Sequence, residues 1–267
     1  MRDPRRQRRL LIRASMALHL LAVIVLIAEP GQWPWALGVV VANHTLLAVL
    51  GLWPRSRWLG PNWTRLPEAA AARHEIALTI DDGPDPIVTP RVLDLLDRGS
   101  ARATFFCIGD KAERYPDLCT EIVRRGHAVE NHSQHHRHHF ALLGPSGFRR
   151  ELQAAQDTLS RITGQRPMFF RAPAGLRNPL LDPVLTQLGL RLVSWTARGF
   201  DTRIGDTARV TNRLLKDLRA GAILLLHDGN AARTRDGVPV ILEVLPVVLA
   251  AADAADLRCV TLRTAFS

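Results

Sequence analysis

From residue 74 to the C-terminus, short apolar segments rich in β-branched and aromatic residues alternate with segments of helical periodicity. Strands alternating with helices are typical of a parallel sheet with helical crossovers, and catalytic groups then collect at the carboxyl ends of the strands. We therefore expect an α/β fold, an irregular seven-stranded (β/α) barrel. The expected strands span 76–80, 103–108, 128–130, 168–170, 191–196, 222–226 and 259–262.

The first part of the chain contains two apolar runs, at residues 10–28 and 35–53, separated by the turn-forming segment Glu-Pro-Gly-Gln-Trp-Pro. Each run has about the 20 residues that a helix needs to cross a bilayer. Small residues typical of a signal-peptide cleavage site do not follow the first run. We therefore expect residues 1–58 to form an N-terminal transmembrane helical hairpin that contacts the membrane through residues 10–53, with a linker at 59–73 and a globular domain at 74–267. The tryptophans at the ends of the runs suit membrane interfaces: Trp33, Trp35, Trp53 and Trp58.

The net charge of +10 is scattered, apart from one arginine cluster at residues 2–9 that precedes the first apolar run. A nucleic-acid-binding chain would show a basic stripe with interleaved aromatic residues, so we expect no nucleic-acid partner. The turn between the apolar runs lacks Lys and Arg, whereas Arg55 and Arg57 follow the second run. The basic-residue rule therefore predicts that both ends of the hairpin, and the domain, lie in the cytoplasm, or outside it if only one run spans.

Two adjacent carboxylates, Asp81 and Asp82, leave the first expected strand and are followed by Gly83 and Pro84. Like charges at such a site repel, so one of them must be neutralised or bind a cation. Because neighbouring side chains point in different directions, one carboxylate could face a metal and the other a substrate water. The alternative interpretation is an ordinary Asp-Asp-Gly-Pro turn.

Five of the ten histidines follow the third expected strand, within residues 132–139. His132 and His136 are four residues apart and would lie on one face of a helical turn. With one Asp they would make a three-ligand site that leaves room for water, as catalytic Zn²⁺ sites do. His132 with His135 is the rival pair, and we expect His138 and His139 to be surface residues or to support the site.

Other strand ends carry further candidates. Arg171 lies on a Pro/Gly corner and could hold a carboxylate bidentately, with Asp201 as a candidate partner. Trp195 could be a core residue or part of a binding site. His227 ends the sixth expected strand, where the pKa of its imidazole could be tuned for acid–base chemistry, although a buried structural histidine is the alternative.

These segments resemble the motifs of the NodB-type polysaccharide deacetylases, carbohydrate esterase family 4, over residues 74–262. Thr79 to Pro84 resembles the first motif, with Ile80 for Phe. The other motifs resemble His132-Ser133-x-x-His136, Arg171-x-Pro173-x-Gly175 and Leu224-x-Leu226-His227. The fourth motif, usually Asp-x-x-Asp-Trp, departs here, because Arg198 to Thr202 keeps only the second Asp.

The resemblance implies a NodB homology domain and assigns roles to residues. It implies a divalent metal, most often Zn²⁺ but also Co²⁺, Ni²⁺ or Mn²⁺, held by Asp82, His132 and His136. The implied catalytic residues are Asp81 as base, His227 as acid, Arg171, which would pair with Asp81 and hold it in its ionised form, and Asp201. The implied substrate-binding residues are Pro173, Ala174, Trp195, Leu224 and Leu226, of which Ala174 offers a backbone N–H to the oxyanion and the two leucines receive the acetyl methyl.

The function that follows from the resemblance is metal-dependent removal of an N-acetyl group from an amino sugar in a glycan, as in chitooligosaccharide and polysaccharide deacetylases. The hairpin and the altered fourth motif leave a second hypothesis open, deacylation or deformylation of a lipid-linked amino sugar at the membrane. A third is a non-catalytic metal- or glycan-binding protein. With the hairpin, the resemblance implies a location at a bacterial inner membrane.

Overall fold

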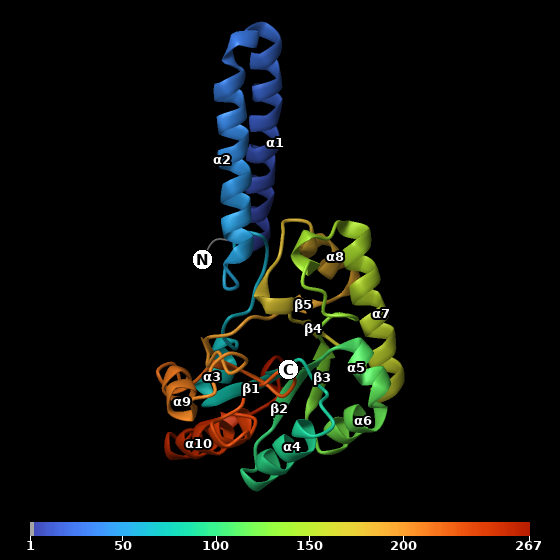
Figure 1. Cartoon of the computed structure of the whole chain (residues 1–267), viewed down its shortest axis with the longest axis vertical. Helices are drawn as coiled ribbons and strands as arrows, with labels where there is room; N and C mark the ends of the chain where they lie inside the picture. Colours follow the sequence, from blue (N-terminus) through green and yellow to red (C-terminus); the bar gives the residue numbers. More distant parts are fainter. Residues whose placement is uncertain (1–2) are drawn as a thin grey trace.

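The computed structural model describes residues 3–267, and a helical hairpin projects from a single α/β domain (Figure 1). Helices α1 (Pro4–Ala28) and α2 (Trp33–Leu52) form the hairpin, joined by the 3-10 turn η1 (Pro30–Gln32). Both helices are long and apolar enough to cross a membrane, a property that signal sequences share. The exposed surface of the hairpin is largely apolar; Ile27, for example, is 78% exposed.

Polar contacts hold the two helices together and fix the base of the hairpin to the domain. The Asn43 amide donates a hydrogen bond to the Ser15 hydroxyl (2.8 Å), across the helix pair. At the base, the Arg8 guanidinium donates to the carbonyl of Pro179 (2.9 Å). The backbone N–H of Arg177 donates to the carbonyl of Gly51 (3.2 Å). Both ends of the hairpin therefore contact the same face of the domain.

The sheet is parallel, with strand order β5-β4-β3-β2-β1-β7-β6, and β8 pairs with the start of β1. Most strands coincide closely with the expected segments, but the fifth is split into β5 and β6, and the seventh overlaps β8 only at Cys259. The strands are β1 (Glu75–Asp81), β2 (Ala103–Cys107), β3 (Ala128–Asn131), β4 (Phe169–Phe170), β5 (Arg191–Leu192), β6 (Ala197–Arg198), β7 (Ile223–His227) and β8 (Arg258–Cys259).

The closed seven-stranded barrel that we expected is instead a curled half-barrel, in which β5 and β6 form opposite edges of the main sheet. The chain from 191 to 198 passes from one edge of the sheet to the other. Val193 N–H donates to the carbonyl of Phe170 in β4, whereas Thr196 N–H donates to that of Ile223 in β7. Between these points, Ser194 N–H donates to the carbonyl of Trp63. The segment around Trp63 thus lies in the gap.

Helices cover the outer face of the sheet, and several end where glycine permits a positive φ. Gly164 and Gly189 end α7 and α8 in this way, as expected. The remaining helices are α3 (Glu68–Ala72), α4 (Val88–Arg98), α5 (Gly109–Arg114), α6 (Pro116–Arg124), α7 (Pro145–Thr163), α8 (Leu181–Leu188), α9 (Thr207–Leu215), α10 (Ile241–Ala254) and α11 (Leu262–Ala265), with 3-10 turns η2 (Phe140–Leu142) and η3 (Pro173–Gly175).

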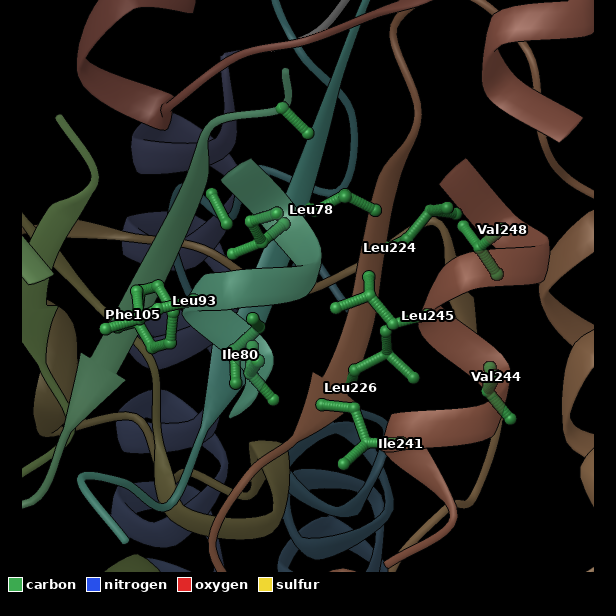
Figure 2. Close-up of a cluster of buried hydrophobic side chains, with 14 of the residues drawn as sticks. Leu78, Ile80, Leu93, Phe105, Leu224, Leu226, Ile241, Val244, Leu245 and Val248 are labelled. Carbon is green, nitrogen blue, oxygen red and sulfur yellow. The ribbon is translucent and has the colours of Figure 1, made fainter. Parts of the chain in front are cut away.

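Side chains of β1 and β7 alternate between a hydrophobic core and the concave face of the sheet. Leu224 and Leu226 are fully buried in the core, against Leu245 of α10 (Figure 2). The residues that alternate with them along β7, such as Leu225 and His227, line a cavity on the concave face. Because side chains alternate between the two faces, one strand supplies both core residues and residues that line the cavity.

Candidate metal and catalytic site

The two aspartates at the end of β1 face different partners. Asp81 Oδ1 accepts a hydrogen bond from Arg171 Nη1 at 2.7 Å. Asp82 has a positive φ of 70°, which turns its side chain away from that of Asp81. Its Oδ1 lies 3.2 Å from Nε2 of both His132 and His136. The adjacent carboxylates therefore serve separate positions in one cavity.

Asp82, His132 and His136 each offer one ligand atom, and these atoms lie within 4.8 Å of one another. We expected a helical turn to bring the two histidines together, but the chain forms a tight loop in which Ser133 and His136 have positive φ. The Ser133 backbone N–H donates to the Asn131 side chain (2.8 Å), and the His136 N–H to the Ser133 hydroxyl (3.0 Å). These local bonds fix the loop.

The ring orientation of His132 suits a metal ligand. Its Nδ1 lies 2.8 Å from the carbonyl oxygen of Arg171, and a carbonyl can only accept, so Nδ1 carries the proton. That leaves the lone pair of Nε2 directed at the cluster. A backbone carbonyl that fixes the tautomer is a common support for metal-bound histidine. The donor set of one carboxylate and two imidazoles thus fits a divalent cation such as Zn²⁺.

The ionisation of the cluster also suits a cation. Burial would raise the pKa of Asp82, but without a cation a protonated His132 Nε2 donates to this carboxylate, and that hydrogen bond with the nearby imidazoles holds the pKa of Asp82 well below its usual range. A bound cation would take the place of that Nε2 proton. Burial, reinforced by His132, lowers the pKa of His136 to about 4. At neutral pH the cluster therefore contains a carboxylate beside a neutral His136 imidazole.

The rival pair, His132 with His135, is not brought together. His135 Nδ1 lies 2.8 Å from Glu151 Oε1, and its backbone N–H also donates to Glu151. His138 and His139 are exposed, and His138 lines the edge of the cavity.

Arg171 is fully buried, and its guanidinium donates hydrogen bonds to several neighbours. Among residues 3–267, Asp81 is the only carboxylate that pairs with it. Its guanidinium also donates to the Thr79 hydroxyl (2.8 Å) and to the Ser194 carbonyl (2.8 Å). Arg171 thus pairs with Asp81, as the resemblance implies, and the alternative pairing with Asp201 is not observed. Asp81 occupies that position instead, because Thr79 and Asp81 share the concave face of β1.

Asp201 instead supports His227. Its Oδ1 lies 2.9 Å from His227 Nδ1, and its Oδ2 accepts the backbone N–H of His227 at 2.7 Å. Burial lowers the pKa of His227, but the carboxylates of Asp201, Asp81 and Asp82 outweigh burial and raise that pKa above its ordinary value. Because Nδ1 donates to Asp201, Nε2 is the ring atom left for the cavity.

A cavity of about 250 Å³ contains the cluster and brings together residues from several strand ends. Ala174 lies on its wall, with a positive φ of 54°, and Trp195 forms another part of the wall. Leu224 and Leu226 point into the core, on the face of β7 opposite to the cavity. Our expectation that they line the acetyl-binding position is therefore wrong, because the neighbouring residue on the strand faces the cavity. Leu225 lines the cavity instead, and Pro173 is buried without lining it.

Sequence reasoning missed two polar residues that contact Asp82 and a third that contacts His135. Asn230 donates to Asp82 Oδ2 at 3.1 Å, and Lys111 Nζ donates to the Asp82 backbone carbonyl at 2.8 Å. Glu151, which turns His135 away, was missed as well. Asn230 lies only three residues after His227, so its place beyond a strand end was a usable signal. Lys111 and Glu151 lie on helices α5 and α7, and the spacing of residues along those helices gave no sign that either side chain would reach the site.

Comparisons with known proteins agree with this geometry. Residues 68–193 match the sequence profile of the polysaccharide deacetylase family. A chitooligosaccharide deacetylase of Azorhizobium caulinodans is 39% identical over 157 residues, which cover 58% of this chain and 73% of that protein. A peptidoglycan-N-acetylglucosamine deacetylase of Bacillus cereus is 30% identical over 174 residues, covering 64% of this chain and 62% of that protein, less than two thirds of its length.

Solved structures show the same fold. A crystal structure of a peptidoglycan N-acetylglucosamine deacetylase superposes with a TM-score of 0.68 and 27% identity, covering 76% of this chain and 91% of that one. A pseudoenzyme of carbohydrate esterase family 4 from Bacillus anthracis also reaches a TM-score of 0.68, at 19% identity, which shows the fold alone. On the strength of the sequence matches, this chain belongs to the polysaccharide deacetylase family, carbohydrate esterase family 4.

Proposed function

We propose that this protein is a metal-dependent deacetylase that removes an N-acetyl group from an amino sugar in a glycan. The observation that carries the proposal is the triad of Asp82, His132 and His136, with ligand atoms within 4.8 Å of one another, in the same cavity as Asp81 and His227. Binding a metal requires only the triad, whereas hydrolysis also requires a base and an acid beside it. Both are present.

Asp82, His132 and His136 would hold the metal, and Zn²⁺ suits two imidazoles and a carboxylate, although Co²⁺, Ni²⁺ and Mn²⁺ accept similar donors. A bound divalent cation supplies polarisation of the acyl carbonyl and a water of lowered pKa, near 7 in zinc enzymes. Asn230 and Lys111 hold Asp82 in place through its free oxygen and its carbonyl.

Asp81 is placed to accept the proton of the attacking water. Its Oδ2 lies 3.9 Å from His132 Nε2, so it borders the metal cluster without joining it. Its Oδ1 accepts a hydrogen bond from Arg171, which fixes the orientation of the carboxylate that would take the proton. Arg171 also carries the carbonyl that orients His132, so this one buried residue positions both the base and a ligand.

His227 is placed to donate a proton to the departing amine. Its raised pKa favours the protonated imidazole that a general acid needs, and Asp201 fixes the ring from the side away from the cavity. The backbone N–H of Ala174, at the exposed tip of η3, is positioned to stabilise the developing oxyanion. Trp195 forms the wall against which the sugar would pack.

Two features bear on the alternatives. A purely metal- or glycan-binding protein would not need the Arg171–Asp81 and Asp201–His227 pairs, both of which bury charges at a cost that binding does not repay. The contact of the hairpin with the domain favours a substrate at the membrane, including a lipid-linked amino sugar. We therefore keep deacylation of such a lipid as the second candidate.

The hairpin serves, in this proposal, as an inner-membrane anchor. Its exposed apolar surface suits lipid, and the Asn43–Ser15 hydrogen bond satisfies polar groups within the helix pair. Because Arg8 and Gly51 both contact the domain, the N-terminus and the domain lie on one side. The basic-residue rule assigns that side to the cytoplasm.

The proposal is tested with the full-length protein in detergent, by measuring acetate released from N-acetylglucosamine oligomers and bound metal. Chelation should abolish release, and Zn²⁺ should restore it. We expect His136→Ala to lower metal affinity more than about 100-fold, because even outer partners of metal ligands contribute about 10- to 100-fold. Asp81→Asn should keep the metal and lose turnover.

His135→Ala is the matched control, because it removes a neighbouring imidazole that contacts Glu151 rather than Asp82. It should keep both metal and activity. Loss of metal in His135→Ala with retention in His136→Ala would refute the ligand set. Chelator-resistant acetate release would refute metal dependence.

A further inference from the structure

A second, larger cavity of about 960 Å³ adjoins the one that contains the triad. Trp195 and Arg198 line both, so the two spaces share a wall. The base of the hairpin forms one side, and α9 forms the other. We call this cavity the interfacial groove; its main lining residues are Trp53, Pro54 and Arg55 from the hairpin base, Arg198 and Phe200 after β6, and Arg209, Arg213 and Lys216 on α9.

The groove is strongly basic. Five cationic side chains line it, and the one acidic residue on its wall, Asp217, pairs with Arg219 at 2.8 Å. Among residues 3–267, none of the five cations forms an ion pair. Arg198 Nε is buried and has no hydrogen-bond partner in this part of the chain. Several cations lie together without a carboxylate partner, and one of them has an N–H donor that is not used. Such an arrangement is suited to bind an anion.

Two of these cations contact the same aromatic ring. The guanidinium groups of Arg198 and Arg213 lie 4.9 and 5.2 Å from the centre of the Phe200 ring. Arg198 also lies 5.4 Å from the Trp195 ring. Two like charges on one ring repel, and an anion between them would relieve that repulsion. Planar guanidinium groups fixed in this way match the oxygens of a phosphate.

The groove lies where a membrane surface would be. Trp53 follows the last residue of α2 directly and is 54% exposed, as suits an aromatic residue at a bilayer interface. Figure 1 shows the domain side of the hairpin, where α2 leads into the domain. Arg198 also stands at the first position of the motif in which this chain departs from its family, where an acidic residue is usual. The departure thus adds charge to the groove.

We propose that the interfacial groove binds the phosphate or diphosphate of a lipid-linked amino sugar, while the acylated sugar occupies the neighbouring cavity. This inference rests on the proposed function, and it specifies the substrate class. The lipid tail stays in the bilayer beside α2, the phosphate contacts Arg198, Arg209 and Arg213, and the sugar passes Trp195. A free sugar phosphate would offer the same anion without the tail.

The test uses the full-length protein in phosphatidylcholine nanodiscs, with a polyprenyl diphosphate N-acetylglucosamine as the probe and chelator present to prevent turnover. Equilibrium binding is measured for the wild type and for Arg209→Gln/Arg213→Gln. The charge-matched control is Arg91→Gln/Arg98→Gln, two exposed arginines on α4 outside the groove. We expect the groove variant to bind the probe about tenfold or more weakly, and the control to bind like the wild type.

Three results would overturn the inference. The first is equal binding by the two double variants. The second is equal affinity for soluble N-acetylglucosamine 1-phosphate and for the lipid-linked probe, which would assign the groove to a free phosphate. The third is displacement of the probe when phosphatidylglycerol replaces phosphatidylcholine, which would make the groove a site for bulk anionic lipid.

A separate readout distinguishes this inference from the proposed function. Wild-type protein is assayed, with metal, for acetate release from a phosphate-free N-acetylglucosamine tetramer and from the lipid-linked probe. Release from either substrate retains the deacetylase, so a negative binding result would then refute only the groove. No release from either would refute the deacetylase, whatever the groove binds.

Discussion

The pair formed by Asp201 and His227 allows a sharp test of the proposed acid. Asp201 is fully buried and accepts two hydrogen bonds from His227, one from Nδ1 and one from the backbone N–H. Asp201→Asn keeps the shape but removes the charge, and its amide can accept through only one oxygen. Its NH₂ group must then face an N–H donor.

The magnitude follows from the strength of these bonds. A hydrogen bond to a charged group contributes about 1.5–3 kcal/mol, and a neutral one about 0.5–1.5 kcal/mol. Removing the charge therefore disfavours the imidazolium by roughly 1.4 kcal/mol, which corresponds to about one pKa unit. Because Asp201 raises the pKa of His227, its loss lowers that pKa. The pH above which activity falls should thus decrease by about one unit.

The assay is the pH dependence of kcat/KM for acetate release, from about pH 5 to about pH 9, which reports the ionisations of the free enzyme. Asp236→Asn makes the same chemical change on an exposed loop and should leave the profile in place. A folded Asp201→Asn protein whose basic limb coincides with that of the wild type, or lies at higher pH, would show that His227 is not the acid.

Two further predictions concern stability and topology. Burial lowers the pKa of His127 to about 4, so the folded state favours the neutral imidazole. The free energy of unfolding should therefore decrease by up to about 3 kcal/mol as pH falls from about 6.5 to about 4. His127→Asn should flatten this dependence in denaturation curves, and an unchanged slope would contradict the assignment. An impermeant maleimide should label Gln32→Cys, in the hairpin turn, from the membrane face opposite to Arg235→Cys, and labelling of both from one face would contradict the spanning hairpin.

Strand ends were the part of the site that the sequence could predict, because motifs after buried strands must meet on one edge of a parallel sheet. Asp81, Asp82, His132 and His227 were found in this way. The alternation of side chains along β7 could also have been used, but we did not apply it. With His227 facing the cavity, Leu225 must face it too, and Leu224 and Leu226 must face the core.

Other features depend on contacts between distant parts of the chain. The pairing of Arg171 with Asp81 followed only from the resemblance to the family, and the pairing of Asp201 with His227 was not predicted at all, because the order of residues does not show which carboxylate each of them meets. The split of the fifth strand depends on Trp63, more than a hundred residues away, which bridges to Val193. A sequence pattern reports local periodicity, so it cannot show which edge a short strand joins.

In the membrane-anchored arrangement that we propose, the contacts of Pro54 would fix the distance between the bilayer and the cavity that contains Asp82. The Pro54 carbonyl accepts hydrogen bonds from Asn62 (2.8 Å) and from the Ser194 hydroxyl (2.7 Å), and Gly175 leaves room for its ring beside Trp195. With the hairpin in a bilayer, the cavity would stay at a constant distance from the lipid, and acyl groups on glycan chains far from the membrane would be out of reach. Removing residues 1–58 would also remove Trp53, Pro54 and Arg55, which form one wall of the interfacial groove.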